Sequence, residues 1–147
     1  MRIETFFPYR LAVVAEMFSR QLVSVYGREY GLTREEWRLL FLLEDAGSID
    51  SVALAQRTSL DKVQVSRAAT RLEEKGLIVR TVADADRRLR NYAVTDKGRV
   101  LFQKAFVEVE ARANAILTSM PEQDRLALEN GIAALHKAVR LTTEPAS

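Results

Sequence analysis

Hydrophobic side chains recur at intervals of three and four residues along most of the chain, which is the spacing of an amphipathic α-helix. Polar residues that can cap a helix precede these stretches: Thr33 and Glu36 form a capping-box pattern, Asp50 or Ser48 precedes a short stretch, and Asp61 precedes the next. Glycines lie near the C-terminal ends of several of these stretches. The first 76 residues therefore predict four helices, over approximately residues 8–27, 33–47, 50–56 and 61–76, the first ending between Gly27 and Gly31.

The pattern changes after Gly76. β-Branched and large apolar residues at 77–82 and at 92–94 predict two short strands, with a polar, charged stretch between them. Thr95 can cap a long helix, and Ser119 with Pro121 and Glu122 opens a last one. The order of four helices, two strands and two helices predicts a mainly α fold with a small two- or three-stranded β-ribbon.

Composition narrows the classes of function. At 147 residues, with 48% hydrophobic and 29% charged residues, the chain is expected to form a single domain over residues 1–147. It has no cysteine and one histidine, His136, so we expect no metal site. The sequence contains no nucleotide-binding glycine motif and no nucleophile–histidine spacing typical of hydrolases. We therefore expect no catalytic residues, no cofactor and no enzymatic activity.

The chain has no apolar stretch long enough for a signal peptide or a membrane span, so we expect a cytoplasmic protein without a membrane partner. Its net charge is only +2, but residues 57–99 carry 11 Lys and Arg against 6 Asp and Glu. A basic middle between more acidic flanks is typical of a module that binds a polyanion. A solvated charged face is the alternative.

Residues 52–76 combine a short helix, a tight turn and a second helix, which is a helix-turn-helix arrangement. Helical spacing places Val65, Ala68, Ala69 and Leu72 on one side of the second helix, where they can pack. The opposite side carries the residue types that bind bases or phosphates in a major groove. These candidates are Lys62, Gln64, Ser66, Arg67, Thr70 and Arg71. The alternative is an ordinary amphipathic helix with a solvated outer face.

The tip of the predicted ribbon is also basic. Arg87, Arg88 and Arg90 could enter the minor groove beside a recognition helix, where narrow A·T-rich stretches have the most negative potential. The alternative is a solvated loop held by Asp84 or Asp86.

Three segments together resemble the MarR family of bacterial winged helix-turn-helix regulators. They are GLTREEWRLLFLLED, LAQRTSLDKVQVSRAATRLEEKGLIVR and DADRRLRNYAVTDKG, and the resemblance extends over roughly residues 10–141. It implies a winged helix-turn-helix DNA-binding region at 33–97. It also implies a homodimer formed through helices at 1–30 and 98–141. The periodic apolar residues of these outer helices support a dimer independently, with a single-chain bundle as the alternative.

The wing departs from the family pattern. That pattern reads D-x-R-D-x-R, and here Asp86 and Arg88 match its last Asp and Arg while Ala83 and Ala85 replace the first pair. The resemblance implies that Arg88 binds in the minor groove and that Asp86 supports the wing. Arg87 and Arg90 are then expected to contact phosphates.

Members of the family commonly respond to small aromatic or phenolic anions in a cleft between the dimerisation helices and the winged region. The candidates here are Tyr9, Arg10, Trp37 and Arg38, beside Phe6 and Phe7. Ordinary core and interface packing is the alternative for each.

We therefore predict a repressor that binds a pseudo-palindromic operator in double-stranded DNA as a homodimer and responds to a small aromatic or phenolic effector. The alternative is a winged-helix protein that acts through protein–protein contacts, or that binds DNA non-specifically without an inducer.

Overall fold

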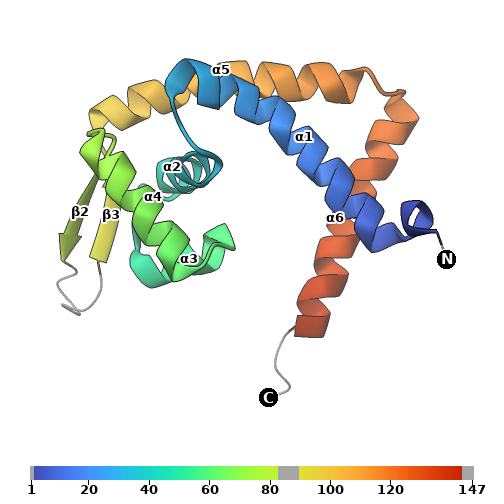
Figure 1. The fold of residues 1–147 in the computed structure, drawn as a ribbon, viewed down its shortest axis with the longest axis horizontal. Helices are drawn as coiled ribbons and strands as arrows, with labels where there is room; N and C mark the ends of the chain where they lie inside the picture. The colour runs from blue at the N-terminus through green and yellow to red at the C-terminus, as the bar shows by residue number, and fades with distance from the viewer. Residues whose placement is uncertain (1, 83–89, 144–147) are drawn as a thin grey trace. The chain divides into compact units, whose positions relative to one another are not determined.

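The computed structural model describes residues 2–82 and 90–143, and it confirms a mainly α fold with a small sheet (Figure 1). By contacts the chain divides into two compact units, residues 1–110 and 111–147. None of the described helices is both long and apolar enough to cross a membrane. In chain order the elements are a 3-10 turn (Ile3–Thr5), α1 (Phe7–Tyr30), α2 (Arg34–Ala46), β1 (Ser48–Asp50), α3 (Ser51–Thr58), α4 (Lys62–Glu74), β2 (Ile78–Val82), β3 (Arg90–Val94), α5 (Asp96–Thr118) and α6 (Glu122–Thr143).

The sheet has three antiparallel strands in the order β1-β3-β2. The hairpin of β2 and β3 pairs Ile78 with Val94 and Val82 with Arg90. The third strand, β1, was not predicted as a strand, because three residues with one apolar side chain show no alternation of their own. It forms where Ser48 pairs with Ala93 of β3, so the distant strand supplies its hydrogen-bond partners.

Helices α2, α3 and α4 pack around a core to which β2 and β3 contribute. Leu39, Leu40 and Leu43 of α2 are completely buried. The predicted inner face of α4, which comprises Val65, Ala68, Ala69 and Leu72, is also buried. The two alanines have small side chains, so α4 can approach its neighbours closely. This packing confirms the helix-turn-helix reading and leaves the opposite face of α4 exposed.

Side-chain caps begin most of these helices where the sequence predicts them. Asp50 accepts a hydrogen bond from the amide of Ala53 at 2.8 Å, and Asp61 and Gln64 form a complete capping box at the start of α4. Thr95 accepts from the amide of Gly98 at 3.0 Å at the start of α5. Gly31, with φ of 67°, ends α1, which continues through Gly27.

The expected capping box at Thr33 and Glu36 is wrong in its second half. Thr33 accepts a hydrogen bond from the amide of Glu36 at 3.1 Å, as predicted. The carboxylate of Glu36 does not return to the cap, because it is buried and bound by Nζ of Lys75 at 2.6 Å. Lys75 also donates to the carbonyl of Gly31 at 2.8 Å, so it ties the end of α4 to the loop between α1 and α2.

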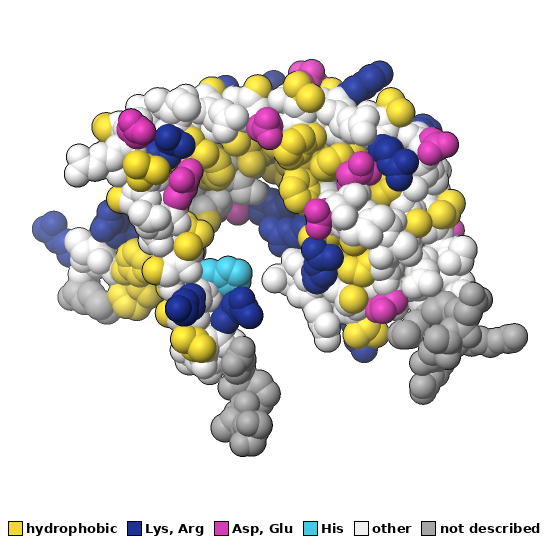
Figure 2. Space-filling view, turned by 180° about the vertical axis from the view of Figure 1, so that it is seen from behind, with side chains coloured by type: hydrophobic (Ala, Val, Ile, Leu, Met, Phe, Trp, Pro, Cys, Tyr) yellow, Lys and Arg dark blue, Asp and Glu magenta, His cyan; other side chains and the backbone are white. Residues whose placement is uncertain are grey.

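The last helix is different, because none of its residues is buried. Leu128, Ile132 and Val139, which belong to the periodic apolar residues of this helix, are 43%, 49% and 51% exposed. Figure 2 shows hydrophobic side chains (yellow) open to solvent on the viewed face of the molecule. Apolar exposure on this scale along a helix is typical of a surface that a partner covers.

Candidate nucleic-acid interface

The outer face of α4 brings together all six candidates for the major groove. The side chains of Lys62, Gln64, Ser66, Arg67, Thr70 and Arg71 are exposed, opposite the buried face of the same helix. A shallow concavity of about 400 Å³ is lined by Ser66, Arg67, Thr70 and Arg71 together with the acidic Glu74. This face is mainly polar and cationic, with Val63 as its exposed apolar residue, so it is suited to base edges and phosphates.

Two of these six side chains already have partners inside the protein. Oε1 of Gln64 accepts a hydrogen bond from the amide of Asp61 at 3.2 Å, which leaves its NH₂ group to donate elsewhere. The hydroxyl of Thr70 donates to the carbonyl of Ser66 at 2.9 Å and can still accept. Within the described ranges, Lys62, Arg67 and Arg71 form no ion pair or side-chain hydrogen bond, so their charges face solvent.

The stem of the wing is fixed beside this helix. Arg80 of β2 forms an ion pair with Glu73 of α4 at 3.3 Å. Arg90 opens β3 and is half-buried. Asp86, Arg87 and Arg88 lie outside the described residues, so their predicted roles stay predictions.

A cavity of about 520 Å³ lies where α1, α2 and the end of α3 meet, which is the size of a small-molecule site. Trp37 and Arg38, two of the four predicted effector-binding residues, line it. Tyr9 and Arg10 are exposed near the start of α1 and are not among its lining residues, and Phe6 and Phe7 are also exposed.

Sequence reasoning missed two arginines of this cavity, Arg34 and Arg57. A signal for Arg34 was present, because it stands three and four residues before Trp37 and Arg38 and therefore shares their helix face. Nothing local identifies Arg57, which belongs to α3 and reaches the cavity only through the fold.

The lining of the cavity combines aromatic side chains with positive charge. Trp37 stacks on Tyr26, with a ring-centroid distance of 5.0 Å and an interplanar angle of 5°, and also on Phe102, at 5.3 Å and 25°. Arg34, Arg38 and Arg57 contribute three guanidinium groups, and no acidic residue is part of the lining. Such a lining favours an apolar ligand that carries negative charge.

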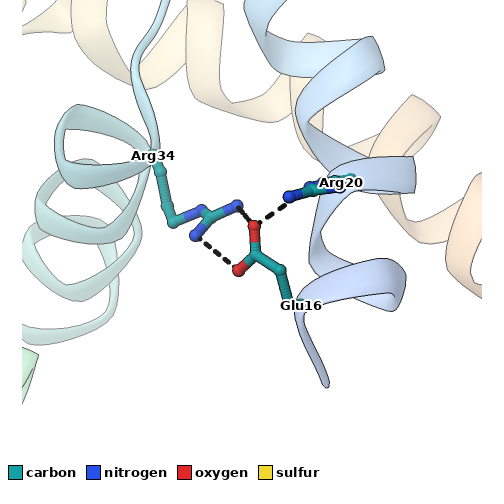
Figure 3. Close-up of polar contacts among 3 residues, drawn as sticks. All are labelled: Glu16, Arg20 and Arg34. Carbon is teal, nitrogen blue, oxygen red and sulfur yellow. Dashed lines mark hydrogen bonds and ion pairs between the residues drawn. The ribbon is translucent and has the colours of Figure 1, made fainter. Parts of the chain in front are cut away.

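Each of these arginines has an internal partner. Arg34 binds the carboxylate of Glu16 through two bonds of 3.0 and 3.1 Å (Figure 3), and Arg57 pairs with Asp45 at 3.4 Å. The Arg34 guanidinium holds the pKa of Glu16 below its ordinary value. Burial raises the pKa of the Tyr26 hydroxyl, and the charge of Arg34 partly opposes this rise.

Arg38 connects the cavity to the turn of the helix-turn-helix. Its guanidinium donates to the carbonyl of Thr58, the last residue of α3, at 3.2 Å. Thr58 is 2% exposed, and its hydroxyl also accepts from the amide of Leu60 at 3.3 Å. The next residue, Ser59, has a positive φ of 60°, unusual for a residue with a side chain. The cavity wall is therefore bonded to the turn that precedes the N-cap of α4.

Comparisons with known proteins agree with this geometry. A sequence model of the MarR family matches residues 30–89. The transcriptional regulator FarR of Neisseria gonorrhoeae is 30% identical over 106 residues, which cover 72% of this chain and 73% of FarR. The chain belongs to the MarR family. Membership confirms the family predicted from the sequence and makes the protein a DNA-binding transcriptional regulator of winged helix-turn-helix type.

Other MarR-family relatives are similar over most of the chain. The homoprotocatechuate degradative operon repressor of Escherichia coli is 28% identical, over 66% of this chain and 68% of the repressor. A crystal structure of NadR in complex with 4-hydroxyphenylacetate has a TM-score of 0.73 and 26% identity, over 89% of this chain and 92% of NadR. These relatives are named for regulation or repression and not for an enzymatic reaction, which is consistent with the expected class.

Proposed function

We propose that this MarR-family protein is a homodimeric repressor that binds a pseudo-palindromic operator and is released by a small aromatic acid. The observation that carries the proposal is the exposed face of α4. Lys62, Arg67 and Arg71 present their charges to solvent on a helix whose other face is anchored in the core. A recognition helix held rigidly by its inner face can place such side chains against DNA reproducibly.

The roles on DNA follow from the chemistry of the side chains. Arg67 and Gln64 are suited to base edges, whereas Lys62 and Arg71 are suited to phosphates, with Ser66 and Thr70 able to contact either. At the wing we assign Arg88 to the minor groove, Arg87 and Arg90 to phosphates, and Asp86 to support of the wing. Residues 33–97 would thus form the DNA-binding region, and the protein would act in the cytoplasm, at the nucleoid when bound.

Dimerisation is proposed from the terminal helices, residues 1–30 and 98–141. Val14 and Met17 of α1 are 63% and 60% exposed, and α6 has no buried residue. A second copy would cover such apolar surface by two-fold symmetry. Symmetry would also present two α4 helices to successive major grooves, so we expect operator half-sites about 34–36 Å apart.

The aromatic acid is proposed from the cavity. Tyr26, Trp37 and Phe41 in its lining offer aromatic surface to a ring, and its arginines offer partners to a carboxylate. NadR was crystallised in complex with 4-hydroxyphenylacetate, and the E. coli relative is named as the repressor of the homoprotocatechuate degradative operon. Arg38 would pass the effect of binding to the turn before α4 through its bond to Thr58.

Fluorescence anisotropy tests the proposal on DNA from the protein's own upstream region and on a scrambled sequence, over a series of salt concentrations. We expect tight binding to the upstream DNA and weaker, steeply salt-dependent binding to the scrambled DNA. Equal weak binding to both would refute specific repression at that site and favour non-specific DNA binding or a protein partner.

Arg67→Ala should cost about 1–3 kcal/mol of binding free energy and should relax the preference at the contacted base pair. Lys62→Ala should instead weaken binding to all sequences alike and reduce the salt dependence. Lys104→Ala, which removes an exposed positive charge of α5, is the matched control and should bind like the wild type. An unchanged base preference in Arg67→Ala would make Arg67 a phosphate contact.

A further inference from the structure

The carboxylate of Glu16 lies between two arginines from different helices (Figure 3). Glu16 belongs to α1 and binds both terminal nitrogens of Arg34, the first residue of α2, at 3.0 and 3.1 Å. Nε of Arg20, one turn further along α1, donates to the same carboxylate at 3.1 Å. The two parallel bonds to Arg34 are the geometry with which a guanidinium recognises any carboxylate.

Arg34 is also part of the wall of the cavity described above. Among its three arginines, Arg38 donates to a neutral backbone carbonyl, and Arg57 makes a single longer contact of 3.4 Å to its carboxylate. Of these three arginines, Arg34 is the one whose two terminal nitrogens both donate to a carboxylate, that of Glu16. A ligand whose carboxylate binds the Arg34 guanidinium in this way must therefore displace the carboxylate of Glu16.

We propose that Glu16 is an internal competitor of the effector. In the free protein Glu16 occupies Arg34, and the carboxylate of an aromatic acid takes its place while Glu16 stays paired with Arg20. The inference rests on the proposed effector site and adds the regulation of that site, together with a requirement for negative charge on the ligand.

The exposure of these groups makes the exchange feasible. The side chains of Glu16 and Arg34 are 41% and 36% exposed, so water reaches both and their pairing is weak enough to be reversible. Arg20 is 71% exposed and already shares the carboxylate, so displacement leaves no buried, unpaired charge. Loss of the Glu16–Arg34 bonds would release a direct tie between α1 and α2, and α2 carries the arginine that contacts Thr58. Effector binding and DNA binding would thus be coupled through one ion pair.

The test uses Trp37, the single tryptophan of the chain, whose fluorescence reports occupancy of the cavity. The probes are 4-hydroxyphenylacetate and its neutral analogue 4-hydroxyphenylacetamide, with calorimetry as a second readout. The variants are Glu16→Gln, which keeps the size of the side chain but removes its charge, and Arg34→Gln. Glu129→Gln is the matched control, because it breaks another exposed pair one turn apart on a helix, that of Arg125 and Glu129.

We expect Glu16→Gln to bind the acid about two- to fivefold more tightly than the wild type, the range set by removal of one exposed competing pair. Its affinity for the neutral amide should not change. Arg34→Gln should lose the preference for acid over amide, and Glu129→Gln should match the wild type. Acid binding by Glu16→Gln with none by the wild type would also support the competition.

Equal affinity of the wild type and Glu16→Gln for the acid would overturn the inference and leave the proposed effector site standing. Absence of acid binding in both proteins would overturn the inference and the effector site together. The anisotropy assay reads the repressor function separately, because loss of specific DNA binding does not alter the comparison of Trp37 titrations.

Discussion

The buried ion pair between Glu36 and Lys75 gives the sharpest test of how α4 is held. Glu36 lies on α2 and is 1% exposed, and Lys75 ends α4 and reaches it at 2.6 Å. We consider the change Lys75→Met, which keeps the apolar stem and removes the charge. The carboxylate then loses its cation, and the carbonyl of Gly31 loses a donor.

The size of the effect follows from burial. Removing one partner of a buried pair costs about 3–5 kcal/mol, because the other charge stays desolvated without compensation. The Lys75 side chain is 40% exposed, so water can partly replace it, and we expect about 3 kcal/mol, near the lower limit. This is a large share of the roughly 5–15 kcal/mol that stabilises a typical domain. The double variant Glu36→Leu/Lys75→Met removes both charges and should recover most of the loss.

Urea denaturation at one fixed protein concentration measures these differences, since a dimer's stability depends on concentration. Glu73→Gln is the control: it breaks the Glu73–Arg80 pair, whose side chains are 41% and 39% exposed, and should cost at most about 1 kcal/mol. If Lys75→Met costs no more than Glu73→Gln, the argument from burial is wrong, and Glu36 does not depend on Lys75 for its place in the core.

Two further predictions concern backbone space and pH. A Cβ at Gly98 would lie 2.1 Å from the carbonyl oxygen of Leu77, so Gly98→Ala should destabilise the folded protein by about 1–3 kcal/mol. A Cβ at Gly131 would have no atom within 4 Å, so Gly131→Ala should stabilise α6 by up to about 1 kcal/mol. Thermal unfolding compares the two, and equal melting temperatures would contradict the close approach at Gly98. Because Arg34 lowers the pKa of Glu16 below 4.5, the stabilisation from this pair is fully present above pH 4.5 and is lost as the pH falls through the lower native value. NMR titration of the Glu16 carboxylate measures this pKa. A midpoint at or above pH 4.5 would rule out the pairing of Glu16 with Arg34 in solution.

The sequence by itself determined the features that depend on neighbours within one or two helical turns. The spacing of Val65, Ala68, Ala69 and Leu72 predicted which face of α4 is buried, and therefore which face carries the DNA-binding candidates. The cap at Asp61 was also predictable, because its hydrogen bond reaches only three residues along the chain. Periodicity and capping are local properties, so they can be read without knowing where the rest of the chain lies.

Only the tertiary structure decided which distant groups meet. The sequence suggested that Glu36 would return to its own cap, but it pairs with Lys75, 39 residues away, because the fold buries its carboxylate beside that amine. Likewise β1 forms because β3 supplies its hydrogen-bond partners. Glu16 binds Arg34, which lies 18 residues further along the chain. The spacing of residues along a chain carries no information about such distances, which are set when the hydrophobic faces of different elements pack together. The recognition face was therefore readable from the sequence, and so were Trp37 and Arg38 of the cavity, whereas the arrival of Arg57 at the cavity and the pairing of Glu16 with Arg34 were not.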